Sequence, residues 1–230
     1  MSDNWIVANL ENAFATWNDK MAEIWTLVTT SPENFKGGTV WSVVEGINGG
    51  LQAIGLGLLV LFFAMSIFKS TASFRDFQRP EYALRHFIRF VAAKVAITYA
   101  MDLMVALYTI CGGVVSQIAG SLGGVGGASV SLPAAIETAV EDAGFWASIP
   151  LWLVTILGSL FITIMSFIMI MSVYGRFFRL YMYTALAPVP LATFAGETTA
   201  EMGKHFVKSY VGVCLEGAVI VLACIIFTAF

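Results

Sequence analysis

The sequence predicts an all-α, polytopic helical membrane protein with about five transmembrane segments, one of them broken by prolines, and an amphipathic N-terminal helix. Hydrophobic residues make up 58% of the 230 positions, charged residues only 12%, and the mean hydropathy is +0.82. A soluble domain of this size could not bury so much apolar surface. The apolar residues also fall in long runs, several of which reach the roughly 20 residues that a helix needs to cross a bilayer.

Residues 1–47 form the first part of the chain, an N-terminal segment with one periodic apolar face. Apolar side chains recur every three or four positions, which is the spacing of one helical face: Ile6, Leu10, Phe14, Trp17, Met21, Ile24 and Val28. We expect this amphipathic helix to lie on the membrane surface or on a partner, rather than on the protein's own helices.

The transmembrane domain is predicted to fill residues 48–230. Four apolar runs have the length of a crossing, and a shorter run makes a fifth; the expected spans are 48–68, 90–111, 150–174, 180–195 and 210–230. A glycine-rich loop without Lys or Arg is expected from Gly112 to Ile149, with a short helix starting near Pro133. It lacks the Gly-Lys-Ser/Thr sequence of a phosphate-binding loop.

The distribution of basic residues predicts the orientation, because short cytoplasmic loops retain Lys and Arg. Segment 69–89 carries five basic and two acidic residues, a net charge of +3, and is predicted to be cytoplasmic. Segment 1–47 carries two lysines and six acids, a net charge of −4. We therefore expect a multi-pass protein of the bacterial cytoplasmic (inner) membrane with an extracytoplasmic N-terminus, exported without a cleavable signal.

The run from Leu180 to Ala195 is interrupted by Pro188 and Pro190. Each proline removes an amide donor, and a broken helix persists in lipid only where protein or water satisfies the freed carbonyls. We expect this segment to be packed inside an assembly or to line a cavity. It could cross or re-enter, and the segment Gly196–Ser209 has no net charge to decide between them; we favour the crossing.

Enzymatic chemistry has no candidate residues in this sequence. The three cysteines lie in or beside apolar runs, the two histidines have no acidic or Cys cluster, and no nucleophile–base order appears. We predict no enzyme activity, no cofactor and no metal site.

Charged residues inside apolar spans are costly in lipid, so they are the intramembrane candidates for function. Asp102 lies near the centre of the second expected span, Lys94 nearer its cytoplasmic end, and Glu216 six residues into the last. Lys94 can extend its side chain back to the headgroups. Asp102 needs a partner on another helix or a water-lined face, and Glu216 is expected to be interfacial or interhelical. Small-residue stripes on the second and third spans favour close helix packing.

The C-terminal quarter carries a recognisable block. Arg176 and Arg179 are followed by the run Ala185–Ala192 with Pro188 and Pro190, then by Gly196 and Glu197, and then by Lys204–Phe206 before the last span. This block resembles the central part of TrbL-type polytopic subunits of type IV secretion and conjugation systems, in the form carried by mobile elements of Gram-positive bacteria.

The resemblance implies a non-enzymatic membrane subunit that forms a homo-oligomer and helps build the translocation channel or pilus assembly platform. Its implied partners are the system's ATPases, scaffold and pilin-like subunits, with transient contact to transferred DNA or protein. Family members usually continue beyond the point that matches Phe230, so we expect a longer parent protein. The alternative from the residues alone is a small ion-coupled transporter or channel that uses Asp102 and the Pro-broken segment.

Overall fold

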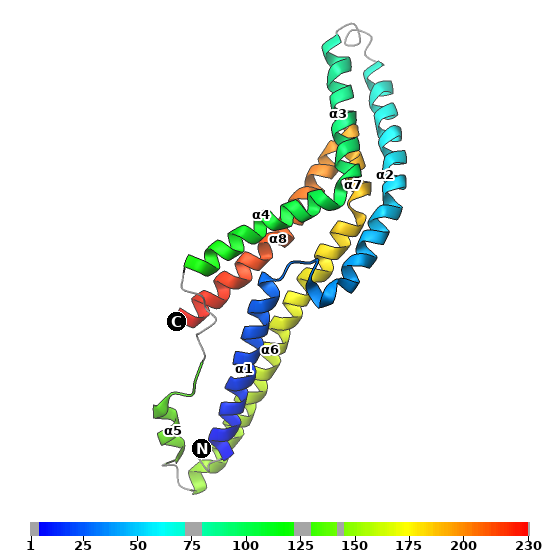
Figure 1. Cartoon of the computed structure of the whole chain (residues 1–230). Helices are drawn as coiled ribbons and strands as arrows, with labels where there is room; N and C mark the ends of the chain where they lie inside the picture. The colour runs from blue at the N-terminus through cyan, green and yellow to red at the C-terminus, as the bar shows by residue number, and fades with distance from the viewer. Residues whose placement is uncertain (1–4, 72–79, 122–129, 142–144, 230) are drawn as a thin grey trace. The chain divides into compact units, whose positions relative to one another are not determined.

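The computed structural model describes residues 5–71, 80–121, 130–141 and 145–229, in which every regular element is helical (Figure 1). The elements are α1 (Trp5–Thr29), η1 (Phe35–Gly38), α2 (Thr39–Thr71), α3 (Pro80–Thr98), α4 (Ala100–Ser121), α5 (Ala134–Glu141), α6 (Phe145–Leu186), α7 (Pro188–Ala192), η3 (Thr193–Ala195) and α8 (Ala200–Ala229). The all-α polytopic fold is confirmed.

Four helices in the described residues are long and apolar enough to cross a membrane: Thr39–Lys69, Ala100–Ile118, Trp152–Leu186 and Ala200–Ile226. The shorter fifth span that the sequence predicts, 180–195, is not among them. Helix α4 also extends through Gly112 and Gly113, where a loop was expected, and the glycines from Gly123 to Gly127 lie outside the described residues.

The chain forms two compact units. The first contains Met1–Thr29, Ser116–Gly175 and Val219–Phe230, and the second contains Thr30–Val115 and Arg176–Ala218. Helices α4, α6 and α8 each have residues in both units.

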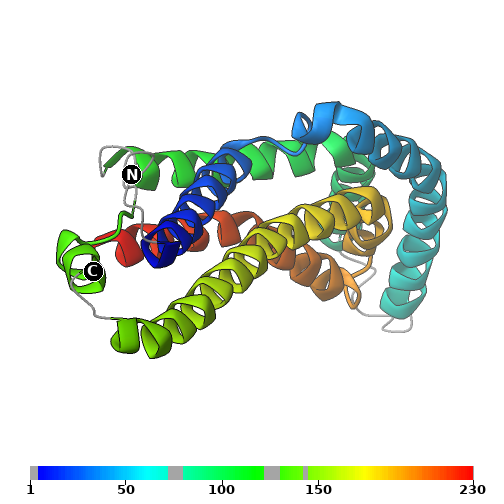
Figure 2. The same cartoon turned by 90° about the horizontal axis from the view of Figure 1, so that it is seen from below.

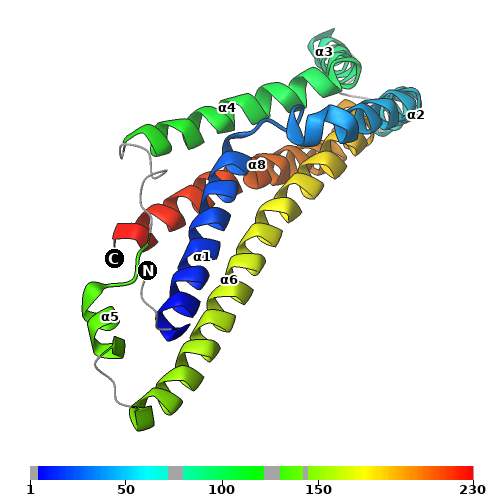
Figure 3. The same cartoon turned by 60° about the horizontal axis from the view of Figure 1, so that its bottom comes forward.

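In the first unit α1 packs along the N-terminal part of α6 (Figure 3). The rings of Trp5 and Trp152 lie 5.5 Å apart, and Asn9 Nδ2 donates to Ser159 Oγ at 3.4 Å. Part of the apolar face of α1 is thus buried on the protein itself, although the membrane surface or a partner was expected. Contact of the remaining face with either stays a prediction. Two further polar residues of α6 in this unit, Thr155 and Ser166, are buried.

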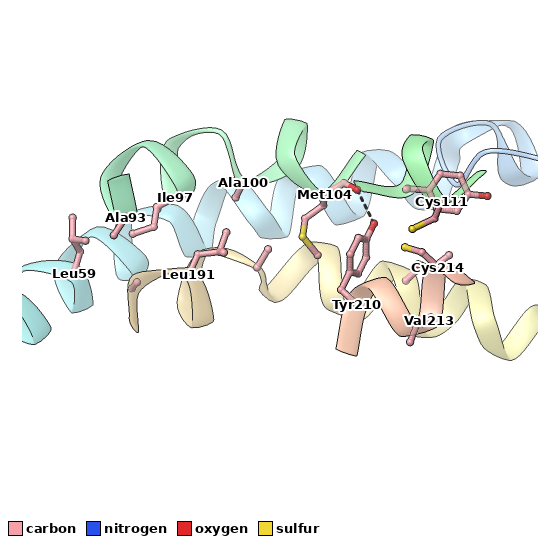
Figure 4. Packing of buried hydrophobic residues seen from close by; sticks show 14 of the residues in the cluster. Leu59, Ala93, Ile97, Ala100, Met104, Cys111, Leu191, Tyr210, Val213 and Cys214 are labelled. Carbon is pink, nitrogen blue, oxygen red and sulfur yellow. Dashed lines mark hydrogen bonds between the residues drawn. The ribbon is translucent and has the colours of Figure 1, made fainter. Parts of the chain in front are cut away.

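The core of the second unit joins α2, α3, α4, α7 and α8 (Figure 4). Met104, Leu191 and Cys214 are among its fully buried side chains, and the hydroxyl of Tyr210 donates to the carbonyl of Met104 at 2.9 Å. This hydrogen bond ties α8 to α4 and satisfies the only polar atom of a buried ring, as a buried tyrosine requires.

A bend at Tyr99 separates α3 from α4, so the expected single span 90–111 does not exist. The backbone bonds that bridge the bend are Tyr99 N–H to Val95 O and Leu103 N–H to Tyr99 O. The side chain of Gln52 on α2 donates from Nε2 to the carbonyls of Thr98 at 2.9 Å and Ile97 at 3.4 Å. Carbonyls left at the end of α3 thus receive donors from a neighbouring helix, as a helix end in an apolar environment requires.

A second break lies between α6 and α7, where Pro188 has no N–H to offer the carbonyl of Thr184. The buried side chain of Asn48, also on α2, donates to that carbonyl at 2.6 Å. Gly55 lets α2 approach the break closely, because a Cβ at this position would lie 2.7 Å from the carbonyl oxygen of Pro188. The Pro-broken segment is therefore packed inside the protein, against α2 and α3.

The segment after α6 continues in the direction of α2 and then reverses into α8 (Figure 2). Thr184 contacts Asn48, Pro188 lies close to Gly55, and Gly196 lies close to Phe62. Segments 184–196 and 48–62 therefore run side by side in the same direction. Arg89 Nη1 lies 3.2 Å from Glu197 Oε1 in the turn before α8. Residues 196–199 thus lie at the same end of the second unit as Arg89, and α6 is followed by α7 without a reversal of the chain. Whether 180–195 is a crossing of its own stays a prediction.

The segment that leads into α2 is held by two tyrosine hydroxyls. Tyr108 donates to the carbonyl of Thr30 and Tyr181 to that of Pro32, both at 2.9 Å. Phe35 stacks on Phe177 with ring centroids 4.2 Å apart. Gly37 and Gly38 then turn the chain with positive φ angles of 71° and 76°, which other residues rarely adopt.

Replacing Asn48 tests whether its side chain compensates for Pro188. We expect Asn48→Leu to lower the free energy of unfolding in detergent by about 1–2 kcal/mol, because the carbonyl of Thr184 then keeps only the long hydrogen bond from Ala187 N–H, at 3.4 Å. In a Pro188→Ala background the backbone regains an N–H at this position, and the loss should shrink. An equal loss in both backgrounds, measured by thermal unfolding, would show that Asn48 acts in another way.

Two free cysteines provide a direct test of the packing between α4 and α8. Figure 4 shows the sulfur atoms of Cys111 and Cys214 facing one another in the core. We expect copper phenanthroline, a lipid-soluble oxidant, to join them in a disulfide, seen as a reducible shift in gel mobility. Cys224→Ser should retain the shift and Cys214→Ser should lose it; an unchanged wild-type band would contradict this packing.

Candidate functional site: a buried arginine beside an ion pair

Arg176 is a buried cation in the apolar helix α6. Its side chain is 1% exposed. Nε donates to the carbonyl of Val213 at 3.3 Å and Nη2 to that of Cys214 at 3.1 Å. The guanidinium carbon lies 5.7 Å from the ring centroid of Tyr108 and 5.9 Å from that of Phe177. Two helix carbonyls and two aromatic rings thus replace water around the charge.

This arrangement leaves the charge incompletely compensated. Within the described residues Nη1 has no hydrogen-bond partner, and no carboxylate oxygen lies within 4.0 Å of the guanidinium. Burying a cation without a counterion is costly, and such groups in membrane proteins usually mark a function.

Gly217 on α8 makes room for this guanidinium. A Cβ built at position 217 would lie 2.7 Å from Cζ and Nη1 of Arg176 and 2.8 Å from Nη2. The nearby Gly212 has open space at the same point. The absence of a side chain at 217 therefore allows the arginine to reach the carbonyls of α8.

An ion pair lies one helical turn further along α6. Arg179 Nη2 donates to Glu216 Oε2 at 2.6 Å, and the two side chains are 46% and 35% exposed. Both residues belong to candidate membrane spans. A half-exposed ion pair on apolar helices requires protein or water beside it when the helices are in lipid. It therefore marks a face that a bilayer alone does not cover.

A protein-family model matches most of this chain. The family described as "TrbL/VirB6 plasmid conjugal transfer like protein" matches residues 17–188, which are 172 of the 230 residues. The chain belongs to the TrbL/VirB6 plasmid conjugal transfer-like family. Neither the curated proteins nor the solved structures contain a match.

The matched region begins at residue 17, far upstream of the block from Arg176 onward on which the resemblance to this family was based. It includes Arg176, Arg179 and Pro188 and ends before Pro190, Gly196 and Glu197. Family membership and the four apolar helices together indicate that this chain is a multi-pass membrane protein of a conjugal transfer system. Such a protein works with other transfer components.

Asp102 and Lys94 lie outside this site. Asp102 is exposed and in the first turn of α4, rather than at the centre of a span, because the bend at Tyr99 starts a new helix there. A carboxylate in this position complements the positive end of the helix dipole. Lys94 is exposed on α3. Neither has an ion-pair partner in the described parts of this family member.

The family block itself is divided between two places. Arg176 and Arg179 lie at the buried arginine and the ion pair, whereas Gly196 and Glu197 lie in the turn that Arg89 holds. Pro188 begins α7 and Pro190 lies inside it. In the described residues, no three His, Cys, Asp or Glu side chains gather closely enough to hold a metal ion.

Gly217→Ala tests whether this glycine positions Arg176. We expect the new methyl group to displace the guanidinium from its carbonyl acceptors and to lower the free energy of unfolding by about 1–2 kcal/mol. Gly212→Ala on the same helix should not destabilise the protein. With Arg176→Met, Gly217→Ala should cost little, because the shorter apolar side chain leaves room; a loss that persists there would rule out this coupling.

Proposed function

We propose that this protein is a membrane subunit of a type IV secretion or conjugation machine. It assembles with copies of itself in the bacterial cytoplasmic membrane, helps form the translocation channel or pilus assembly platform, and catalyses no reaction. Its partners are the machine's ATPases, scaffold and pilin-like subunits, and it contacts the transferred DNA or protein transiently. Family membership supports the machine, and the half-exposed Arg179–Glu216 pair supports assembly.

The Arg179–Glu216 ion pair is the main observation in support of the proposed assembly. The guanidinium of Arg179 and the carboxylate of Glu216 are bonded to each other, yet these side chains are 46% and 35% exposed, respectively, within candidate membrane spans. A neighbouring subunit or a water-filled passage would hydrate or cover them, whereas lipid chains would not. Either neighbour fits a subunit that surrounds a path for a large substrate.

The proposed orientation places the N-terminus outside and segment 69–89 inside. The basic excess of that segment supports it, because cytoplasmic loops retain Lys and Arg. The turn at residues 196–199 then also faces the cytoplasm, since Glu197 is paired with Arg89. This side is where ATPases would meet the subunit.

The alternative of an ion-coupled transporter or channel finds little support at the two features on which it rests, the Pro-broken segment and Asp102. The Pro-broken segment is filled by buried apolar side chains, including Ala187, Leu191 and Ala192, and Asn48 occupies the carbonyl that the break frees. Asp102 lies in another helix, at its start. We therefore do not propose solute transport.

Charge reversals at the ion pair test the proposed function in a mating assay. We expect Arg179→Glu or Glu216→Arg alone to lower transfer at least about tenfold, because like charges then meet on apolar helices at a cost of more than about 1.4 kcal/mol. The double reversal should restore most of the transfer. The same single variants should also reduce the mass of the assembly purified in mild detergent.

The matched control is the Glu201–Lys204 pair at the start of α8, where the candidate span begins and a helix reaches the headgroups. Its atoms also lie 2.6 Å apart, but its side chains are 67% and 55% exposed. Glu201→Lys should leave transfer within a few fold of wild type, because exposed pairs contribute about 0–1 kcal/mol. Wild-type transfer by both single reversals at Arg179 and Glu216, with normal protein levels in the membrane, would refute the proposal.

A further inference from the structure

A pocket with an apolar wall and one lysine, Lys69, lies at the end of α2 in the second unit. Its volume is about 420 Å³. Phe62, Met65 and Phe68 form the wall, and Lys69, Thr198 and Thr199 are among the polar residues that line it. The turn before α8 therefore meets the end of a candidate membrane span at this pocket.

The charge available in the pocket is positive. Lys69 forms no ion pair within the described residues. The two acids around the turn are neutralised, since Glu197 is paired with Arg89 and Glu201 with Lys204. The lysine ammonium is thus the charge that an occupant of the pocket would meet.

The hydroxyl groups differ in what they can offer an anion. Thr199 Oγ1 already donates to the carbonyl of Thr193 at 2.8 Å, with Gly196 O at 3.4 Å. Thr198 is exposed and forms no side-chain hydrogen bond within the described residues. Lys69 and Thr198 both line the pocket and have donors to offer an anionic group there.

The depth of the pocket identifies the kind of molecule that fits. Lys69 is the last residue of the candidate span Thr39–Lys69, where a membrane helix reaches the headgroup region. Phe62 and Met65 lie one to two turns further into that span. An occupant would meet a cation at the headgroup level and an apolar wall at the level of the acyl chains.

We propose that this pocket binds an anionic phospholipid. The headgroup phosphate accepts hydrogen bonds from Lys69 and Thr198, and an acyl chain lies along Phe62 and Met65. The net charge of +3 on segment 69–89 adds attraction for an anionic lipid. This site is separate from the buried arginine and its ion pair, and it does not depend on the proposed function.

Native mass spectrometry of the full chain in detergent tests the proposal with two lipids of identical acyl chains. We expect one phosphatidylglycerol to be retained in preference to phosphatidylcholine. Lys69→Gln should weaken this retention about fivefold, the effect of one lysine near an anionic surface. Thr198→Val, at an exposed position where folding is not at stake, should weaken it by a smaller factor.

Lys208→Gln is the control, because it removes an exposed charge of the same sign from α8 outside the pocket. Equal retention of the two lipids, or equal losses in Lys69→Gln and Lys208→Gln, would overturn the proposal. A competition experiment with inorganic phosphate at about 10 mM, a large excess over the lipid, distinguishes a lipid site from a site for the free anion. Displacement of phosphatidylglycerol by phosphate alone would identify a site for the free anion and refute the lipid site.

Discussion

The second unit depends on two amide side chains of α2 that satisfy backbone carbonyls on other helices. Asn48 donates to Thr184, and Gln52 donates to Ile97 and Thr98. The two residues are four positions apart and therefore lie on the same face of α2. One face of one helix thus makes two helix breaks compatible with an apolar environment, and both breaks determine where α4, α7 and α8 run.

The buried arginine follows from the same arrangement. The turn at residues 196–199 directs α8 back along the end of α6, which brings the carbonyls of Val213 and Cys214 to Arg176. Gly217 then admits the guanidinium, and Glu216 on the neighbouring position meets Arg179. Two arginines three residues apart therefore have different environments, one enclosed by the protein and one open to whatever surrounds it.

The class of fold and the family could be predicted from the sequence, because both depend on local patterns that are present however the helices pack. Long apolar runs and the Arg–Pro–Gly–Glu block belong to this kind. The bend at Tyr99 was missed, since neither proline nor an accumulation of polar residues marks it. An Asn and a Gln four positions apart in an apolar run were the available signal for both breaks, because each needs a partner in lipid.

The site was predictable only in part. Arg176 and Arg179 were recognised as members of the block, but which one is buried depends on the course of α8. Tyr108 and Gly217 could not be predicted, because their roles arise from contacts between helices that are far apart in the sequence. Asp102 was expected near the centre of a span because the two helices on either side of Tyr99 look like one apolar run, whereas it lies near the start of the candidate span Ala100–Ile118.

The hydrogen bond from Asn48 to Thr184 also limits how relatives of this protein can diverge. In a chain with proline at position 188, a side-chain donor at position 48 supplies the short hydrogen bond that the backbone cannot, whereas a chain with another residue at 188 supplies it from its own N–H. Loss of the asparagine therefore costs less stability after loss of the proline than before it. One missing N–H thus favours one order of change at these two positions during evolution.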